Sequence, residues 1–274
     1  MSTRINTNIE ALNASRNLGR ISDMLTKNLQ KLSSGLRINS AADDAAGLSI
    51  SERMKSQLGG LKSATSNAND AITLVQTAEG ALAETHNMLL RMRELAVRSS
   101  TDSIDSVART VNQNEVTKLI TNINNISAVT KYNGIVLLDG SVSELQFQVG
   151  ANNTANDRTI LTVTAADAAT IGADGVDIST KDGALTAIDA IDAAISNVSV
   201  IRSELGATQN SLERNINSLS TSIENTTASI SRITDADMAD EMVSFTKNNV
   251  LGKAAQRMLA QANAMPLSFL ELLQ

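Results

Sequence analysis

Apolar residues recur every seven positions along much of this chain, which is a helical pattern. Between residues 42 and 98, one track of positions spaced seven apart holds only apolar residues: Met54, Leu61, Ala68, Val75, Leu82, Leu89 and Ala96. A helix over this range would be about 80 Å long at 1.5 Å per residue, which is too long for an ordinary globular domain. A seven-residue repeat sustained over such a length predicts a left-handed supercoil with a partner helix.

A second heptad track, nearer the C-terminus, supplies that partner within the same chain. It runs from about residue 185 to 233 and contains Ile191, Val198, Leu205, Leu212, Leu219 and Ile233. We therefore predict that the two long helices pair antiparallel, with a shorter helix over about 104–129 beside them. After that helix, Asn-Gly and Asp-Gly turn signals, the alternating "LQFQVG" and the β-branched "RTILTVT" predict a β-hairpin region at about 133–164.

The two ends of the chain carry apolar stripes of their own. These are Leu18, Ile21, Leu25, Leu29 and Leu32 at the N-terminal end, and Leu251, Met258, Met265, Phe269 and Leu272 at the C-terminal end. A single chain cannot bury both stripes, so we expect these ends to be disordered alone and to fold when neighbouring molecules cover them. Gly252 interrupts the last helix at a cost of about 1 kcal/mol relative to a better helix former.

Two short joints are expected to separate the terminal helices from the long ones. In "KLSSGLRINSAADDAAGLSI", Gly35 can adopt the left-handed conformation that ends a helix. Ser40 stands three residues before Asp43, the spacing of a capping box, which predicts that a new helix begins at about residue 41. Thr234 and Asp237 repeat this spacing near the C-terminus. The alternative is a polar patch within one continuous helix.

These patterns together predict a mainly α fold, a long antiparallel coiled-coil helical rod made by the N- and C-terminal arms, with a small β-hairpin region. Residues 1–34 and 235–274 are expected to form one domain of terminal helices, and residues 35–44 the joint. Residues 45–183 and 184–234 are expected to form a second domain with the long helices, the third helix and the hairpins. Within it, residues 165–183 are expected to be a short loop.

Composition narrows the possible functions. The 274 residues include no Trp, one Tyr and three Phe, so the core is expected to consist of thin aliphatic seams. The net charge is −6 and the 23 basic residues are scattered, which argues against nucleic-acid binding. No cysteine is present, and no window has the apolar length of a signal peptide or a membrane span. We therefore expect no disulfide and no membrane insertion.

Candidate chemistry is sparse. His86 is the one histidine, so a zinc site or a His-assisted nucleophile would lack partners. The acidic cluster Asp235, Asp237, Asp240 and Glu241 lacks the turn glycine and the terminal Glu of an EF-hand loop. Charge at a helix start explains this cluster better than calcium does. We expect neither catalysis nor a cofactor.

Several long motifs resemble bacterial flagellin, in the same order and near the same ends. They are "KLSSGLRINSAADDAAGLSI", "RMRELAVRSS", "YNGIVLLDG", "FQVGAN", "ITDADMADEMVSFTKNNVL" and "MLAQAN", and the similarity covers residues 1–165 and 184–274. The resemblance implies that the terminal helices form the inner tube of the flagellar filament and the long helices its surrounding shell. The loop at 165–183 would then stand where other flagellins carry large variable domains.

The resemblance also implies partners and a location. The chain would polymerise with copies of itself outside the cell, after export through the flagellar apparatus without a cleavable signal peptide. A flagellin-specific chaperone would bind the C-terminal arm before export, and hook-associated and cap proteins would contact the filament. The nearest alternative is a hook–filament junction protein, which shares the terminal motifs. A cytoplasmic coiled-coil scaffold would explain the heptads but not the paired joints.

The segment "RMRELAVRSS" has two interpretations. Arg91 and Glu94 have the spacing of an ion pair on a solvated helix face. By resemblance, the same segment is the stretch of flagellins that animal toll-like receptors recognise, with Arg91, Leu95 and Glu115 at the main contact positions. The sequence after Glu115 departs from the recognised pattern because it has lost charged residues. Both interpretations remain open at this point.

Overall fold

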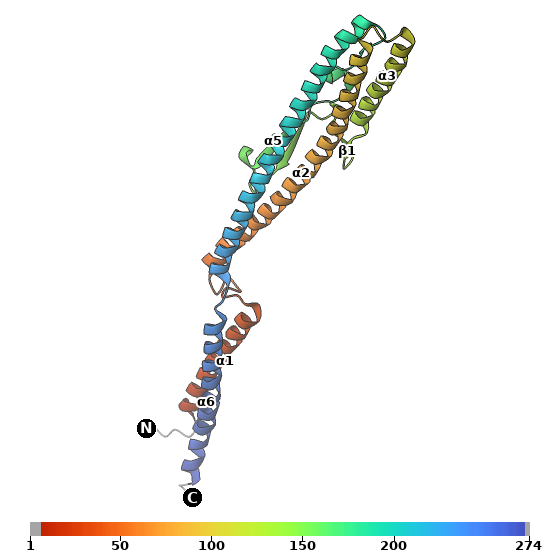
Figure 1. Cartoon of the computed structure of the whole chain (residues 1–274). Coiled ribbons are helices and arrows are strands. Elements are labelled where there is room, and N and C mark those ends of the chain that lie inside the picture. The colour runs from red at the N-terminus through yellow and green to blue at the C-terminus, as the bar shows by residue number, and fades with distance from the viewer. Residues whose placement is uncertain (1–6, 272–274) are drawn as a thin grey trace. The chain divides into compact units, whose positions relative to one another are not determined.

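The structure is a computed structural model that describes residues 7–271 (Figure 1). In chain order its elements are α1 (Ile9–Ser34), α2 (Ala45–Ser99), α3 (Ser106–Val129), β1 (Lys131–Tyr132), β2 (Ile135–Val136), β3 (Glu144–Gln148), a 3-10 turn (Ala155–Asp157), β4 (Arg158–Thr162), α4 (Ala168–Ile171), α5 (Lys181–Thr234) and α6 (Met238–Glu271). The predicted mainly α class with a small β region is confirmed. The chain divides into two compact units, unit 1 with residues 1–56 and 225–274 and unit 2 with residues 57–224.

In unit 2, α2 and α5 run antiparallel with their heptad tracks facing each other. Two ion pairs fix the direction, because Arg93 pairs with Asp192 at 2.6 Å while Arg202 pairs with Glu79 at 2.8 Å. The shared core includes apolar side chains that are at most 1% exposed, among them Val75, Leu82, Leu89, Ile191, Val198 and Leu205. Burying each large aliphatic side chain contributes about 1.5–3 kcal/mol, so this seam stabilises unit 2.

The third helix and the hairpins pack against the same seam. The Asp105 carboxylate caps α3 by accepting a hydrogen bond from the Ala108 N–H at 2.8 Å. Val116 and Ile123 of α3 are fully buried in the core. Strands β1 and β2 form one antiparallel pair, and β3 and β4 form a second pair five residues long. The hairpin region expected from the turn signals is therefore present.

The segment between β4 and α5 covers most of the range 165–183, where we expected a short loop. It contains the short helix α4, and Ile171 and Ile178 are at most 1% exposed. Gln113 of α3 holds the segment, since its Nε2 donates to the Val176 carbonyl at 3.0 Å and its Oε1 accepts from the Ile178 N–H at 2.6 Å. The segment is thus a loop with one short helix, and its apolar residues belong to the core of unit 2.

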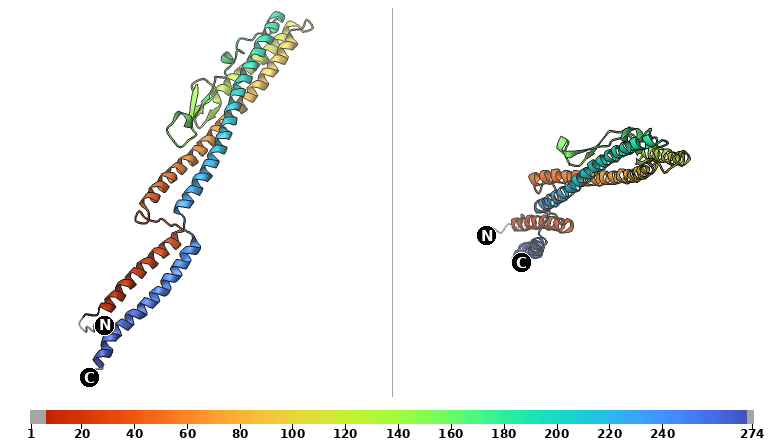
Figure 2. Two further views of the ribbon diagram at one scale, coloured as in Figure 1. Left: turned by 90° about the vertical axis from the view of Figure 1, so that its left-hand side faces the viewer. Right: turned by 45° about the horizontal axis from the view of Figure 1, so that its top comes forward.

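In unit 1, α1 and α6 lie side by side and run antiparallel (Figure 2, left). The direction is fixed near both ends of α1. Asn8 donates from Nδ2 to the Ala262 carbonyl at 2.7 Å, and Asn28 donates from Nδ2 to Glu241 Oε1 at 2.6 Å. Asn8 also caps α1, because its Oδ1 accepts from the Ala11 N–H at 3.0 Å.

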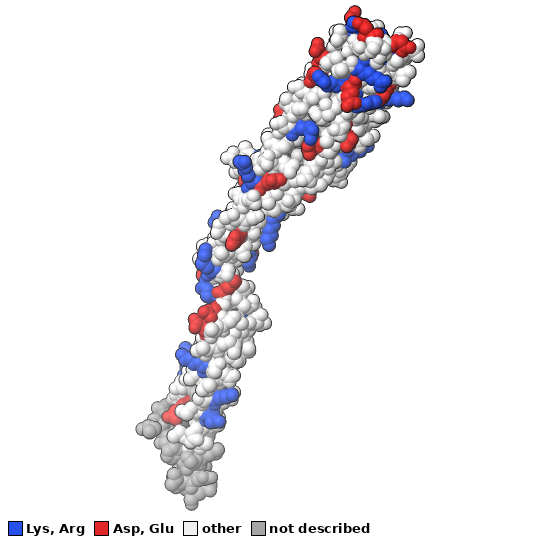
Figure 3. Space-filling model, viewed as in Figure 1, with Lys and Arg blue, Asp and Glu red and all other residues white. Residues whose placement is uncertain are grey.

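Hydropathy and charge add two observations. Helix α5 is long and apolar enough to cross a membrane by length and composition, with a window of mean hydropathy 1.5. The statement that no window approaches a span is therefore corrected. One such helix is weak evidence for a span, because Ile191 and Val198 of α5 are core residues of unit 2. On the face that Figure 3 displays, acidic and basic side chains are interspersed along the described residues.

Candidate assembly site

The predicted N-terminal stripe forms the face of α1 that packs against α6. Leu18, Ile21, Leu25 and Leu32 are all half-buried and recur at intervals of three, four and seven residues. A methyl group added at Gly252 of α6 would lie 3.5 Å from Ile21 Cγ2 and 3.7 Å from Leu25 Cδ1. Within the described residues, most of this stripe is thus already partly covered by the chain itself.

The matching face of α6 is made of residues that the hydrophobic pattern did not single out. These also recur at intervals of three and four and are Phe245, Asn248, Gly252, Ala255, Leu259 and Ala262, all buried or half-buried. Because several of these positions hold small or polar residues, the seven-residue repeat of this face cannot be recognised from large apolar residues alone. Gly252 accordingly lies in the seam, where it was first noted only as a poor helix former.

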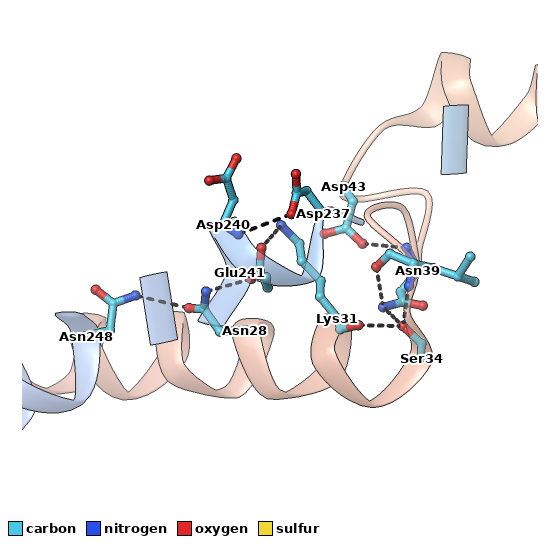
Figure 4. A network of polar contacts seen from close by, with 10 residues as sticks. Asn28, Lys31, Ser34, Asn39, Asp43, Asp237, Asp240, Glu241 and Asn248 are labelled. Carbon is cyan, nitrogen blue, oxygen red and sulfur yellow. Dashed lines mark hydrogen bonds and ion pairs between the residues drawn. The ribbon is translucent and has the colours of Figure 1, made fainter. Parts of the chain in front are cut away.

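A polar layer crosses this seam (Figure 4). Asn28 is only 8% exposed, and its Nδ2 donates to Glu241 Oε1 at 2.6 Å. Asn248 donates from Nδ2 to Asn28 Oδ1 at 3.0 Å, and Lys31 Nζ lies 3.9 Å from Glu241 Oε2. A buried Asn in a helical seam specifies register at a cost in stability. The layer therefore favours one alignment of α1 and α6 and leaves their pairing weaker than that of α2 and α5.

The predicted C-terminal stripe lies on a different face of α6. Leu251 is 43% exposed, Met258 66% and Met265 40%, although the inward residues between them are covered. The Phe269 side chain and Leu272 lie outside the described residues. Leu29 of α1, at 54%, is also exposed, unlike the other members of its stripe.

Further exposed apolar side chains on α1 and α6 extend this surface. They are Ile9, Leu12, Met24, Met238, Met242, Val243 and Val250, each at least 43% exposed. We call these seven residues, together with Leu29, Leu251, Met258 and Met265, the outer apolar surface of unit 1. Exposed apolar side chains that gather in one part of a protein are candidates for an interaction site.

The joint after α1 begins as predicted. Gly35 has φ +71° and its N–H donates to the Lys31 carbonyl at 2.8 Å, which is a left-handed C-cap. The chain then pairs with the joint after α5. The Arg37 N–H donates to the Thr234 carbonyl at 2.6 Å and the Ala236 N–H to the Gly35 carbonyl at 2.9 Å. The two joints therefore form one small antiparallel bridge inside unit 1.

The capping role assigned to Ser40 is wrong. Helix α2 begins at Ala45, and its cap is Asp44, whose Oδ1 accepts from the Gly47 N–H at 2.9 Å. Ser40 instead donates from its hydroxyl to Asp43 Oδ2 at 3.0 Å, and the Ser40 N–H donates to the same oxygen. Asp43 thus makes the expected bond to the Ser40 N–H, but within a turn that precedes the helix.

This turn sets the charge state of Asp43. Hydrogen bonds from the Ser40 hydroxyl, and then from the Asn39 and Ser40 N–H groups, lower the pKa of the Asp43 carboxyl below its ordinary 3.8. The bonds favour the ionised form because the negative oxygen accepts them all. The physical reason for the misplaced cap is that Ser40 and Asp44 are both residue types that cap helices, and the capping-box spacing to Asp43 selected Ser40.

The second joint needs the same kind of correction. Thr234 is the last residue of α5, and its hydroxyl donates to the Ile230 carbonyl at 3.0 Å, so it does not cap α6. Asp237 is the cap, since its Oδ1 accepts from the Ala239 N–H at 2.9 Å. Its carbonyl also accepts from the Glu241 N–H at 3.0 Å. Asp237 therefore keeps a capping role and Thr234 loses one.

The residues singled out for receptor recognition lie in unit 2. Arg91 pairs with Glu115 at 2.8 Å and with Glu94 at 3.0 Å, and these bonds raise the pKa of Arg91. All three charged side chains are exposed. Leu95 is only 2% exposed and belongs to the core. Arg91, Glu94 and Glu115 are thus accessible to a partner, whereas Leu95 is buried in the core.

Within residues 7–271, no group of three or more His, Asp or Glu side chains is arranged to hold a metal ion. His86 is half-buried in α2, and its Nδ1 has no hydrogen-bond partner in the described part of the chain. The interactions that the described side chains of this site can make are therefore apolar contacts, helix caps and ion pairs.

Comparisons with known proteins identify related sequences over nearly the whole chain. The family model of the bacterial flagellin N-terminal helical region matches residues 5–143, and that of the bacterial flagellin C-terminal helical region matches residues 188–273. Flagellin of Halalkalibacterium halodurans is 47% identical over 270 residues, covering 98% of this chain and 99% of that protein. Flagellin of Bacillus subtilis is 43% identical over 310 residues, covering 99% and 100%. The flagellar filament 33 kDa core protein of Treponema phagedenis is 39% identical, covering 98% and 99%.

Solved structures agree with these matches. The crystal structure of Bacillus cereus flagellin is 26% identical with a TM-score of 0.50, covering 56% of this chain and 88% of that chain. A putative flagellar hook-associated protein from Vibrio parahaemolyticus has a TM-score of 0.59 at 14% identity, covering 70% of this chain and 100% of that chain. The second likeness shows the fold alone and does not favour the junction-protein alternative. With both flagellin family models matched and a flagellin 47% identical over nearly its full length, this chain belongs to the bacterial flagellin family.

Proposed function

We propose that this chain is the structural subunit of a flagellar filament and that the outer apolar surface of unit 1 makes the main contacts between subunits. The observation that carries the proposal is the outward stripe of α6. Its residues Leu251 and Met258 are 43% and 66% exposed although the opposite face of the same helix is covered by α1. A helix with apolar residues on two faces is suited to packing against more than one neighbour.

Covering this surface would contribute free energy to assembly. Covering a half-exposed Leu or Met side chain contributes roughly 1 kcal/mol, about half the value for complete burial. Eleven such side chains make up the outer apolar surface of unit 1. Even if only some are covered in each contact, every subunit gains several such contributions when it joins the polymer. Entropy lost on association offsets part of this gain.

The same reasoning supports ordering of the terminal helices on assembly. The seam between α1 and α6 contains Asn28, Asn248 and Gly252, and so it lacks the continuous aliphatic packing of the α2–α5 seam. Such a pair is only weakly stable alone. Residues 1–34 and 235–274 would form the inner tube of the filament, residues 35–44 the joint and residues 45–234 the shell. The role is structural, and no catalytic or cofactor function is proposed.

Partners and location follow from this role. The chain would be exported through the flagellar apparatus without a cleavable signal peptide and would polymerise outside the cell. A flagellin-specific chaperone would bind the exposed apolar face of α6 before export, and hook-associated and cap proteins would contact the filament ends. An animal toll-like receptor would read the exposed charges of Arg91 and Glu115, while the buried Leu95 holds their helix in place.

Assembly of matched variants tests the proposal. Leu29 on α1 and Val200 on α5 are both 54% exposed, but only Leu29 belongs to the outer apolar surface of unit 1. The purified chain is heat-dissociated, cooled and sedimented, and the pellet is examined by electron microscopy. We expect long filaments from the unmodified chain and from Val200→Asp, but not from Leu29→Asp or Met258→Asp. Filaments from both of these last variants would contradict the proposed contacts, and none from the unmodified chain would contradict self-assembly.

A further inference from the structure

The methionines of this chain are distributed unevenly between the two units. Of nine in the sequence, Met24, Met238, Met242 and Met258 are 43%, 47%, 50% and 66% exposed, and all four lie on α1 or α6. In unit 2, by contrast, Met92 is fully buried. Methionine is common in adaptable interfaces because its thioether is flexible and polarisable. Exposure also makes that sulfur reachable by small oxidants.

We propose that Met24, Met238, Met242 and Met258 form a peroxide-sensitive modification site, and that oxidation of these residues in the free chain prevents polymerisation. This inference rests on the proposed assembly through the outer apolar surface of unit 1. The reagent class is a two-electron oxidant such as hydrogen peroxide. The thioether sulfur attacks one peroxide oxygen, the O–O bond breaks and an S=O bond forms. The sulfur loses two electrons. The second peroxide oxygen leaves as hydroxide, takes up the proton that the first oxygen releases and becomes water.

Accessibility makes the modification selective. Oxidation requires that peroxide reach a sulfur lone pair, so susceptibility follows exposure. Met258, at 66%, is the most exposed of the four, while Met92 at 0% offers no approach. Met242 borders a shallow hollow on α6 that is also lined by Val243, Thr246 and Lys247, so a peroxide molecule can approach it from solvent. Oxidation of the most exposed sulfurs is therefore directed to unit 1, and Met92 in the core of unit 2 is spared.

The consequence differs between the free chain and the filament. In the free chain the new S=O group faces water and accepts hydrogen bonds from it, so folding changes little. In an apolar subunit contact the same group would be buried without a donor, which is strongly unfavourable. Sulfoxide formation therefore weakens assembly and leaves the folded unit intact. Once the filament has formed, the same sulfurs are covered and are expected to react slowly.

The experiment treats the full-length free chain with hydrogen peroxide and follows three quantities. Peptide mass spectrometry should show that Met258 is oxidised at least about tenfold faster than Met92. Circular dichroism melting of unit 2 should be unchanged, while the critical concentration for filament formation should rise about tenfold or more. Treatment with the two methionine sulfoxide reductases should restore assembly, since each enzyme reduces one epimer.

Two variants make the test specific. The quadruple variant Met24→Leu, Met238→Leu, Met242→Leu and Met258→Leu keeps apolar side chains of similar volume but has no thioether at these positions. It should assemble normally and resist peroxide, whereas Met92→Leu should remain as sensitive as the unmodified chain. Loss of assembly by the peroxide-treated quadruple variant, made also with Met265→Leu because Met265 is 40% exposed on the same surface, would overturn the inference, as would normal assembly of fully sulfoxidised chain. In both cases untreated filaments would still support the proposed function; if untreated chain formed none, that function and this inference would both be rejected.

Discussion

Replacing Asp44 by Ala should loosen the first turn of α2 and leave the rest of the helix intact. The Asp44 carboxylate accepts the Gly47 N–H at 2.9 Å, and its carbonyl accepts the Leu48 N–H at 3.0 Å. The substitution removes only the carboxylate, so one helix-start N–H loses its protein partner. Loss of such a cap costs about 1 kcal/mol. Loss of the negative charge at the positive end of the helix adds a few tenths of a kcal/mol, roughly.

The matched change Ser40→Ala should cost less. It removes one hydroxyl bond to Asp43 Oδ2, while the N–H groups of Asn39 and Ser40 still donate to that oxygen. Because the site is exposed, water replaces the lost donor, and the cost should be about 0.5 kcal/mol.

Hydrogen exchange followed by mass spectrometry measures both effects locally. A cost of 1 kcal/mol corresponds to about fivefold faster exchange of the first-turn amides of α2, if they open locally. Asp44→Asn keeps an oxygen acceptor and should exchange nearly as slowly as the unmodified chain. The capping account would be refuted if Ser40→Ala accelerated this exchange as much as Asp44→Ala, or if Asp44→Ala had no effect.

Three further predictions concern packing, helix propensity and pH. Leu205→Ala should destabilise unit 2 by about 3 kcal/mol because Leu205 is 1% exposed, whereas Leu29→Ala should cost about 1 kcal/mol or less because Leu29 is 54% exposed. Chemical denaturation measures both losses of stability, and equal losses would contradict the difference in burial. Gly252→Ala should stabilise the α1–α6 pair by about 1 kcal/mol because Ala has the higher helix propensity. The added Cβ would lie 3.5 Å from Ile21 Cγ2 and 3.7 Å from Leu25 Cδ1, which are ordinary contact distances. Slower amide exchange in α6 would confirm the prediction and faster exchange would refute it. Because the pKa of Asp43 is lowered in the folded chain, its contribution to the stability of the joint is fully present above pH 3.8 and is lost as the pH falls through the lower folded pKa. Carboxyl NMR titration should show this pKa returning toward 3.8 in Ser40→Ala, and an unchanged pKa would refute the assigned cause.

Much of the fold could be predicted because large aliphatic residues mark its core. The track through Leu82 and Leu89 predicted the α2–α5 seam, and both residues are fully buried. Asn133–Gly134 predicted the β1–β2 turn, in which both residues have positive φ. Each of these signals acts locally or repeats over many turns, so a single sequence reveals it.

The remaining features depend on tertiary contacts that leave little trace in the sequence. The α6 side of the α1–α6 seam includes Asn248 and Gly252, which no apolar period reveals, and its polar layer appears only when Asn28 is placed opposite Glu241. The burial of the segment after β4 was not predicted, because its buried residues are spaced alternately two and three apart, which matches neither a helix nor a strand. Contacts from distant residues also hold it, among them Gln113, Asn124 and Asn197.

The cap of α2 shows a different limit. Ser40 and Asp44 are both residue types that cap helices, and the capping-box spacing to Asp43 selected Ser40. The structure decides because Asp43 is held by the preceding turn, which leaves Asp44 to face the Gly47 N–H. The choice between two candidate caps four residues apart is set by the path of the backbone, which a spacing rule does not contain.

The central claim is that subunits contact one another mainly through the outer apolar surface of unit 1. An electron cryo-microscopy reconstruction of filaments formed by the purified chain tests it most directly. The account predicts that α1 and α6 line the inner tube and that Leu251 and Met258, now 43% and 66% exposed, become buried between subunits. A reconstruction in which these two side chains remain in solvent while unit 2 makes the subunit contacts would contradict the account.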